Sequence, residues 1–522
     1  MSISDDIIKY TSGDVYPMHM PGHKRNTGFL QGLPAAIDIT EIDGFDDLHQ
    51  SQGVLRETSS LASKLYGSET AYLLINGATA GVLAAVGGFT RRGDKVLMAR
   101  NCHLSVYNAI ALFGLQPVYI MPDTESASGI ALSIKLEAVE TALRKEGNIR
   151  LVIVTSPTYE GVASDVAAIA AIAHQHGVPL FVDSAHGAHF GFSTGFPASA
   201  ACATAAAAAA GAGRADAVAT ANTATTAVPT AVGTEAVAAA AAAAAGADAV
   251  VMSLHKTLPA LTQCSLLHVN AGGAAADEIG RLLSVFQTSS PSYVLMASID
   301  SCLRTLESES AALFSEYEKK LSAFYSETAK MENLRLQWNP ANEPAAGVFA
   351  FDHGKLVIRT EKTALTGNAL MRALREKYNI ELEMACGNYA LAMTSICDTP
   401  EGFRRLADAL IAIDREQTAA SGALPVSSIP PQTPAVPRRS ALPSDALQLK
   451  GRFVPLEESA ELMSLEYVWA YPPGIPVIVP GEIIDSGMVS YIIDMHSGGI
   501  SLKSTKGRLP EYVYVAERGA NA

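Results

Sequence analysis

The sequence has few features of an exported, metal-binding or membrane-embedded protein. Its 522 residues include six cysteines, none in a CxxC or other paired spacing, which argues against a zinc site and indicates a reducing cytoplasm. Residues 1–20 lack the apolar core of a signal peptide, and no stretch reads as a membrane span. The net charge of −14 argues against nucleic-acid binding and favours cationic small molecules. We therefore expect a cytoplasmic protein without metal, nucleic-acid or membrane partners.

One tract, residues 201–245, contains no aromatic residue, leucine, isoleucine or methionine and is dominated by alanine. Alanine favours helices, but such a tract buries too little apolar area to offset the entropy lost on ordering. We expect a surface insertion, partly helical or disordered, without a catalytic role. A regulatory element and a sequence artefact remain open interpretations of this tract.

Strand-like and helical segments alternate between about residues 71 and 274. Such alternation is typical of βαβ units and predicts a mostly parallel sheet. The strand-like runs are 71–75, 95–98, 117–120, 151–155, 179–182, 249–252 and 265–269.

Three of these runs are followed by residues that together suit a ligand with an aldehyde and a phosphate group. Lys256 follows a run of β-formers and stands where a partly desolvated amine can condense with an aldehyde. Asp183 ends an apolar strand, where open α/β sheets bind ligands. Residues 71–81 read as strand, tight turn and helix start, and the Thr79 hydroxyl with free helix amides can hold a phosphate. Each of the three signals is weak alone. Their order along the chain, a phosphate-binding turn, then Asp183, then Lys256, is much more specific.

With these motifs the chain resembles the Orn/Lys/Arg decarboxylase family, pyridoxal phosphate enzymes of fold type I within the aspartate aminotransferase superfamily. The resemblance covers most of residues 17–300 and is weaker to about residue 412 and after residue 465. The matching runs are 20–24, 38–55, 76–81, 100–103, 155–161, 182–190, 253–256 and 288–293.

The resemblance implies roles for individual residues around pyridoxal phosphate. Lys256 would bind the cofactor aldehyde, Asp183 would keep the pyridine nitrogen protonated, and His103 would stack on the ring. The cofactor phosphate would be held by Ala78, Thr79, Ser253 and His255, with Ser289 reaching the phosphate in the neighbouring subunit. Glu383 would contact the distal cationic group of the substrate.

Several of these residues also have plain structural interpretations. His103 can be a capping or core histidine, the turn around Ser289 can be a helix N-cap, and Glu383 with Glu381 can be exposed carboxylates on one face of a strand over residues 380–384. His186 is a candidate only for supporting the site. The acidic segment that carries Asp43, Asp46, Asp47 and His49 can be a solvated loop or, as in the family, a lip near the active site at the subunit interface.

The expected architecture is α/β with three domains. Residues 1–300 form an arm and a large cofactor-binding domain with a mostly parallel sheet, and residues 301–415 form a small α/β domain. Residues 416–446, rich in Pro, Ser and Ala, read as a linker, and residues 447–522 as a C-terminal α+β domain. The resemblance implies a short form without the receiver-like N-terminal domain of larger members.

The resemblance implies decarboxylation of arginine, lysine or ornithine to a polyamine precursor and carbon dioxide by a homodimer or an oligomer of dimers. Two alternatives stand beside it. An aminotransferase or another fold-type I lyase would clamp the substrate α-carboxylate with an arginine, for which Arg359 is a candidate. A non-catalytic regulator on a decayed enzyme scaffold is the other.

Overall fold

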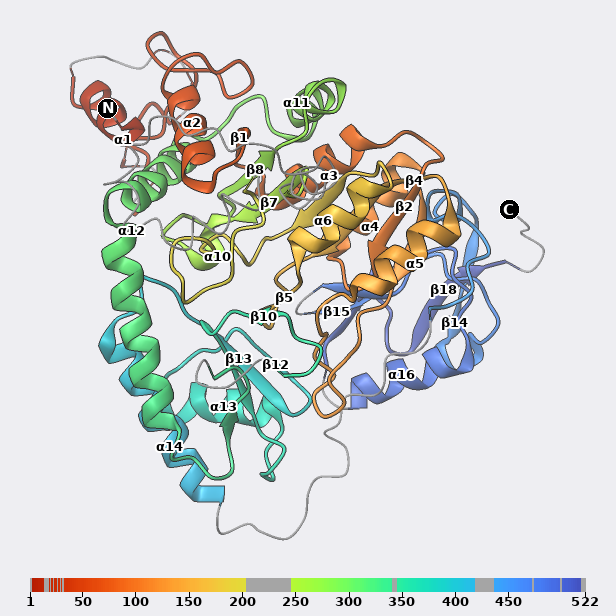
Figure 1. Ribbon diagram of the computed structural model, residues 1–522. Coiled ribbons are helices and arrows are strands. Elements are labelled where there is room, and N and C mark those ends of the chain that lie inside the picture. The colour runs from red at the N-terminus through yellow and green to blue at the C-terminus, as the bar shows by residue number, and fades with distance from the viewer. Residues whose placement is uncertain are drawn as a thin grey trace, which may run out of the picture. The chain divides into compact units, whose positions relative to one another are not determined.

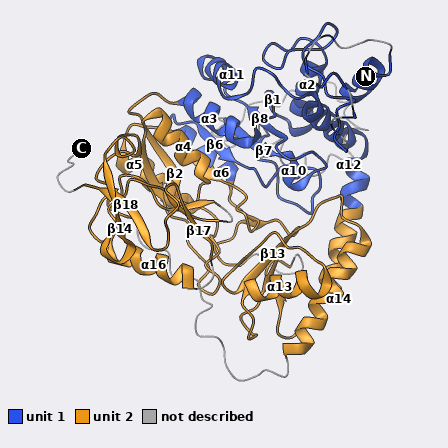
Figure 2. Ribbon diagram, turned by 180° about the vertical axis from the view of Figure 1, so that it is seen from behind, with its two compact units in different colours: residues 1–89, 166–315 blue, residues 90–165, 316–522 orange. Residues whose placement is uncertain are grey.

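A computed structural model describes residues 2–517 except 14–17, 19, 22, 26, 29, 31, 203–245, 340–344, 418–435, 472–473 and 498–499. The chain divides into two compact units, residues 1–89 with 166–315 and residues 90–165 with 316–522 (Figure 2). Most of the alanine-rich tract and of the predicted linker lies outside the described residues, so the expectations for both remain predictions. No described helix is long and apolar enough to cross a membrane.

Unit 1 combines strands with helices, and its elements can be followed by their labels in Figure 1. Strand order is β1-β8-β7-β6; β6 and β7 are parallel, whereas β8 is antiparallel to both β1 and β7. The elements are α1 (Ile3–Thr11), α2 (Val54–Tyr66), β1 (Thr70–Leu74), α3 (Gly77–Phe89), α6 (Val166–Gln175), β6 (Leu180–Asp183), β7 (Ala249–Ser253), α10 (Leu254–Thr257), β8 (Ser265–Val269), α11 (Ala274–Phe286) and the start of α12 (Tyr293–Thr328).

Helix α3 packs closely onto the strands of unit 1 through a glycine. A Cβ atom added at Gly81 would lie 2.7 Å from Leu74 Cδ1 and 2.9 Å from Val251 Cγ2. Because the site needs the start of α3 near the ends of β1 and β7, the absent side chain at Gly81 lets the helix approach the sheet.

Unit 2 holds three parallel strands in the order β4-β2-β3 and an antiparallel sheet in the order β12-β13-β11-β9. Strands β5 and β10 form a separate antiparallel pair. The elements are β2 (Lys95–Ala99), α4 (Leu104–Phe113), β3 (Gln116–Ile120), α5 (Leu136–Glu146), β4 (Ile149–Thr155), β5 (Val162–Ala163), β9 (Arg335–Leu336), β10 (Ala350–Phe351), β11 (Lys355–Arg359), α13 (Gly367–Tyr378), β12 (Met384–Cys386), β13 (Tyr389–Met393) and α14 (Pro400–Gln417).

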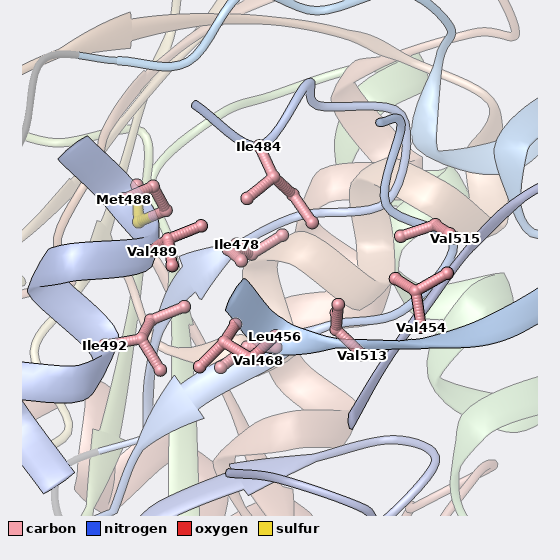
Figure 3. Packing of buried hydrophobic residues seen from close by; sticks show 10 residues of the cluster. All are labelled: Val454, Leu456, Val468, Ile478, Ile484, Met488, Val489, Ile492, Val513 and Val515. Carbon is pink, nitrogen blue, oxygen red and sulfur yellow. The ribbon is translucent and has the colours of Figure 1, made fainter. Parts of the chain in front are cut away.

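The C-terminal part of unit 2 has its own core (Figure 3). Aliphatic side chains from the strands pack against α16, with Ile492 of that helix fully buried. The elements are α15 (Pro443–Ala446), β14 (Gly451–Pro455), β15 (Val468–Ala470), β16 (Ile475–Ile478), α16 (Ser486–Ser497), β17 (Leu502–Ser504) and β18 (Tyr512–Ala516). Ala441 and Ala446 pack with Met463 and Leu465, so the ordered C-terminal region begins before the predicted start at residue 447.

The strands confirm the α/β class expected from the sequence. All seven predicted strand runs between residues 71 and 269 coincide with β1, β2, β3, β4, β6, β7 and β8, with ends that differ by one or two residues. Strands β6, β7 and β8 are buried along their whole length, as is typical of strands covered on both faces, whereas β3 is mostly half-buried.

Candidate functional site

Strand register brings three functional segments to one edge of the sheet in unit 1. Ser265 of β8 pairs with Leu74 of β1 on one side and with Ser253 of β7 on the other. Asp183 of β6 pairs with Val251 of β7, two residues before the end of that strand. The carboxyl ends of β1, β6 and β7 therefore lie at the same edge, where ligands bind in α/β sheets.

Lys256 lies in the short helix α10, directly after β7. Its Nζ is 3.0 Å from Nε2 of His186, a residue 70 positions earlier in the chain. Because an ammonium group only donates hydrogen bonds, Nε2 of His186 accepts here when Lys256 is charged. The side chain of His186 is buried, so the contact restrains the lysine amine from within the protein.

His255 and Ser253 fix the turn that carries Lys256. Nδ1 of His255 lies 3.0 Å from the carbonyl oxygen of Cys264 and donates to it. Burial lowers the pKa of His255, the Cys264 carbonyl opposes this shift, and Lys256 adds to it. Ser253 is buried at the N-cap of α10, with its hydroxyl 3.5 Å from that of Ser265. A neutral His255 thus ties the lysine turn to the start of β8.

Asp183 is a buried carboxylate at the end of β6, with 4 % of its surface exposed. Its Oδ1 accepts a hydrogen bond of 3.1 Å from the backbone N–H of Ala185. That bond orients the carboxylate at the sheet edge that also carries Lys256. A buried carboxylate in this position suits a protonated ring nitrogen.

The start of α3 has the properties of a phosphate cradle. Gly77 has a φ of +74°, and an added Cβ atom there would meet nothing within 4 Å, so the turn opens onto free space. The first turn of α3 contains no acidic residue. Ala78 is half-buried and Thr79 is exposed, so the first amides of the helix and the Thr79 hydroxyl are accessible to an anion.

Residues 287–290 lie against the turn before α3 in the same chain. The Gln287 side chain accepts from the N–H of Ile75 at 2.9 Å and donates to the Leu73 carbonyl at 3.2 Å. The N–H of Thr288 donates to Asn76 Oδ1 at 3.3 Å. Ser289 itself is exposed, and its predicted reach to a neighbouring subunit stays a prediction.

Two hydroxyl groups that the sequence interpretation missed flank the central residues. Among the described residues, the buried hydroxyl oxygens of Ser184 and Thr257 have no hydrogen-bond partner. Buried polar atoms are rarely left unpaired, so these two are suited to a bound polar group. Only their positions in the sequence could have indicated these two hydroxyls, because Ser184 directly follows Asp183 and Thr257 directly follows Lys256.

The acidic segment of the arm is largely occupied with its own backbone. The Asp46 carboxylate accepts backbone N–H groups of Gln52, Gly53 and Leu55 at 2.8–3.1 Å. Asp47 Oδ1 accepts the N–H groups of His49 and Gln50. These two carboxylates cap the loop before α2, which supports the structural interpretation for them.

His103 and Glu383 lie in unit 2. His103 is the N-cap of α4, where its Nδ1 accepts from the N–H of Ser105 at 3.2 Å. His103 is therefore a capping histidine, one of the structural interpretations that the sequence left open, and Nδ1 is the capping atom. A cap uses one nitrogen only, so the predicted stacking of the ring stays a prediction.

Glu383 stands just before β12, which begins at Met384 rather than at Ile380 as expected. Exposed Glu381 and Glu383 alternate with buried Leu382, but each carboxylate has its own partner. Glu381 binds Arg375 Nε at 2.6 Å, and Glu383 accepts from the hydroxyl of Tyr159. Both carboxylates line a cavity of about 420 Å³ in unit 2, together with Asp398 and Arg405.

Arg359 is paired with two carboxylates of the chain itself. Its side chain is fully buried and is engaged by Glu125 at 3.0 Å and by Glu361 at 3.1 Å. Two carboxylates already neutralise its charge in unit 2. These ion pairs argue against Arg359 as the carboxylate clamp of the aminotransferase alternative, although Nη2 of Arg359 has no hydrogen-bond partner among the described residues.

The described residues contain no group of three or more His, Cys, Asp or Glu side chains that could hold a metal ion. The polar side chains at the sheet edge fit pyridoxal phosphate instead. They offer an amine, a buried carboxylate, two unpaired hydroxyls and an open helix start, which match its aldehyde, ring nitrogen and phosphate.

Lysine decarboxylases are among the solved structures that share this fold. The Francisella novicida enzyme LdcF superposes with a TM-score of 0.75 at 19 % identity over 99 % of this chain and 81 % of that chain. The constitutive Escherichia coli enzyme gives 0.74 at 16 % identity over 99 % and 82 %. At these identities the likeness shows the fold, and it confirms the fold type I architecture.

Sequence comparisons cover nearly the whole chain. An arginine decarboxylase of Bacillus subtilis is 28 % identical over 95 % of this chain and 93 % of its own, and the uncharacterized protein YaaO of the same organism is 33 % identical over 92 % and 90 %. The model of the Orn/Lys/Arg decarboxylase major domain matches residues 3–220 and 234–342, and that of the C-terminal domain matches residues 433–500. The motifs at the strand ends, the fold and these matches agree, and the chain belongs to the Orn/Lys/Arg decarboxylase family.

Proposed function

We propose that arginine is the preferred substrate of this chain, with lysine next. As a member of its family the chain is a carboxy-lyase for basic amino acids that depends on pyridoxal phosphate. The finer proposal is supported by the extent of the alignments: four relatives named arginine decarboxylase align over 91–95 % of this chain, whereas the biodegradative arginine decarboxylase of Escherichia coli aligns over 22 %. The lysine decarboxylase LdcA of Pseudomonas aeruginosa aligns over 56 %.

The residues at the sheet edge of unit 1 would hold the cofactor. Lys256 would bind its aldehyde, Asp183 its ring nitrogen, and the start of α3 with Ala78 and Thr79 its phosphate. Ser253 and His255 are assigned to the phosphate as well. When bound, pyridoxal phosphate withdraws the electron pair released as the bond between Cα and the carboxylate breaks.

The chain's own groups would supply the proton that replaces the carboxylate. Nζ of Lys256 and Nε2 of His186 lie 3.0 Å apart, so a proton on either atom can pass to the other. A lysine amine next to a buried imidazole is thus suited to deliver a proton to Cα and to be reprotonated. We assign this role to the pair, with Lys256 as the immediate donor.

Glu383 would bind the distal end of the substrate. A carboxylate can accept two parallel hydrogen bonds from a guanidinium group, whereas an ammonium group binds as a point charge. The Tyr159 hydroxyl donates to Glu383, and burial together with that bond raises the pKa of Tyr159, so the phenol stays protonated. One oriented carboxylate therefore favours arginine in this proposal.

We predict that carbon dioxide release is fastest with arginine and that Glu383→Gln lowers kcat/KM for arginine by about tenfold or more, since a charged partner is lost. Release from arginine, lysine and ornithine, each offered separately to cofactor-loaded protein, gives the measurement. Glu381→Gln is the matched control, because Glu381 is two residues away and pairs with Arg375. Equal rates for all three amino acids, or equal losses in both variants, would contradict the assignment.

We further propose that the chain acts as a homodimer in the cytoplasm. Exposed Ser289, in a hydroxyl-rich turn beside the start of α3, supports a site completed by a second copy. Sedimentation velocity should give a species of twice the chain mass of 54.6 kDa or a multiple of it. A stable, active monomer would overturn this proposal.

A further inference from the structure

The turn that carries His103 is held by the C-terminal part of unit 2. The carbonyl oxygen of Gly474 accepts from the N–H of Leu104 at 3.0 Å, which satisfies an amide at the start of α4. A Cβ atom added at Gly474 would lie 3.2 Å from both Cδ2 and Nε2 of the His103 ring. Gly474 has a φ of +92°, so both the backbone conformation and the approach to the ring favour glycine.

A buried ion pair supports the same turn from the other end. Arg100 follows β2, three residues before His103, and its Nη2 donates to Glu482 Oε2 at 3.1 Å and to the Val477 carbonyl at 3.1 Å. Both side chains are nearly inaccessible, at 8 % and 2 %. Glu482 is itself fixed by the N–H of Val479 at 2.9 Å.

Tyr107 connects this ion pair to the helix that His103 caps. Arg100 Nη1 donates to the Tyr107 hydroxyl at 2.8 Å, and that hydroxyl donates to the Arg100 carbonyl at 2.6 Å. The hydroxyl of Tyr467 donates to the backbone carbonyl of Tyr107 at 3.2 Å. Glu482 thus acts on both the turn and the first turns of α4.

A buried ion pair is a strong geometric constraint. Losing one partner leaves the other charge buried and uncompensated, so the neighbouring backbone moves to rehydrate it. Here the backbone in question is the turn over residues 100–103, which ends in the ring predicted to stack on the cofactor.

We propose that Gly474 and Glu482 are positioning residues that set the His103 ring for cofactor binding. The inference rests on the proposed role of His103 in the decarboxylase. It gives the C-terminal domain a defined part in the reaction, although none of its side chains need touch the cofactor or the substrate. A side chain added at Gly474, or the loss of the Glu482 charge, lowers cofactor affinity and kcat with little effect on KM.

The first test compares Gly474→Ala with Gly507→Ala in the full-length protein. Gly507 has a similar φ of +67°, but an added Cβ atom meets nothing within 4 Å, so it controls for backbone strain. We expect Gly474→Ala to raise the dissociation constant of pyridoxal phosphate about tenfold more than the control does. In the cofactor-free protein it should also slow the reaction of His103 with diethyl pyrocarbonate, measured by mass spectrometry.

A double-mutant cycle separates positioning from a general structural role. If Gly474 acts through His103, then Gly474→Ala adds nothing to the loss of cofactor affinity in a His103→Ala background. Effects that add fully in the double variant, or a Gly474→Ala protein indistinguishable from Gly507→Ala, would overturn the proposal.

Glu482→Gln provides a second variant if Gly474→Ala does not fold. It keeps the size of the side chain but removes the charge that faces Arg100, so we expect faster modification of His103 in the cofactor-free protein and weaker cofactor binding. Unchanged His103 reactivity would refute the role of Glu482. The reactivity and affinity measurements need no turnover, so they remain decisive even if wild-type protein releases no carbon dioxide from arginine, lysine or ornithine, a result that would refute the proposed function alone.

Discussion

Replacement of Lys256 by alanine is expected to reduce carbon dioxide release by at least about 10³-fold, because in the proposed function Lys256 both attaches the cofactor covalently and supplies the amine that returns a proton to Cα. The amine is partly buried at the end of β7 and lies 3.0 Å from His186. No other described lysine lies in α10 at this edge of the sheet in unit 1. The loss should be seen with every basic amino acid tested.

The experiment measures carbon dioxide release and the visible absorbance of the bound cofactor in the same samples. Lys64→Ala is a suitable control, because Lys64 is also in unit 1 but its side chain is 72 % exposed and pairs with Glu307 at 2.8 Å. The control should keep both signals. A Lys256→Ala protein that retains the cofactor absorbance and turnover would exclude Lys256 as the attachment point.

The sequence indicated the site because its main parts stand at the ends of strands. Parallel, buried strands have a clear pattern of apolar residues, so the sequence alone places Asp183 and Lys256 at the carboxyl ends of β6 and β7. The register then brings Asp183, Ser253 and Leu74 to the same edge, because β6 is parallel to β7 and the antiparallel strand β8 pairs with both β7 and β1.

Contacts between distant side chains could not be predicted in the same way. The sequence offered His186 as a candidate for supporting the site, but its approach to Lys256 joins residues 70 positions apart and could not be predicted. The burial of Arg359 between Glu125 and Glu361 likewise depends on how β11 packs. Periodicity reports which face of a strand is buried, but it does not report which charged groups meet there.

At a few positions, side-chain hydrogen bonds or packing give a structure that differs from the one the sequence predicted. Glu381 and Glu383 alternate with a buried leucine, yet regular pairing begins only at Met384. Hydrogen bonds to Arg375 and Tyr159 hold these carboxylates outside the strand. The same limit applies to residues 436–446, whose Pro- and Ala-rich sequence suggested a linker, although Ala441 and Ala446 pack into a core.

Asp183→Asn is expected to lower kcat by about 10²- to 10³-fold while the protein still binds pyridoxal phosphate. Asparagine keeps the shape of the side chain and can still accept from the N–H of Ala185, so the fold at the end of β6 should persist. It removes the negative charge that would keep the ring nitrogen protonated, and an unprotonated ring withdraws electrons less strongly. The defect should therefore lie in kcat rather than in KM.

Rescue by a modified cofactor distinguishes this role from a structural one. A pyridoxal phosphate methylated at the ring nitrogen carries a permanent positive charge, so it should restore much of the activity of Asp183→Asn and give the wild-type protein no gain. Asp248→Asn is the matched control: Asp248 lies before β7, binds His174 at 2.7 Å and accepts from the N–H of Leu180 at 2.8 Å. That change should reduce thermal stability without a response to the methylated cofactor. If the methylated cofactor fails to restore Asp183→Asn, the carboxylate has another function, and the chemistry assigned to the edge of β6 must be revised.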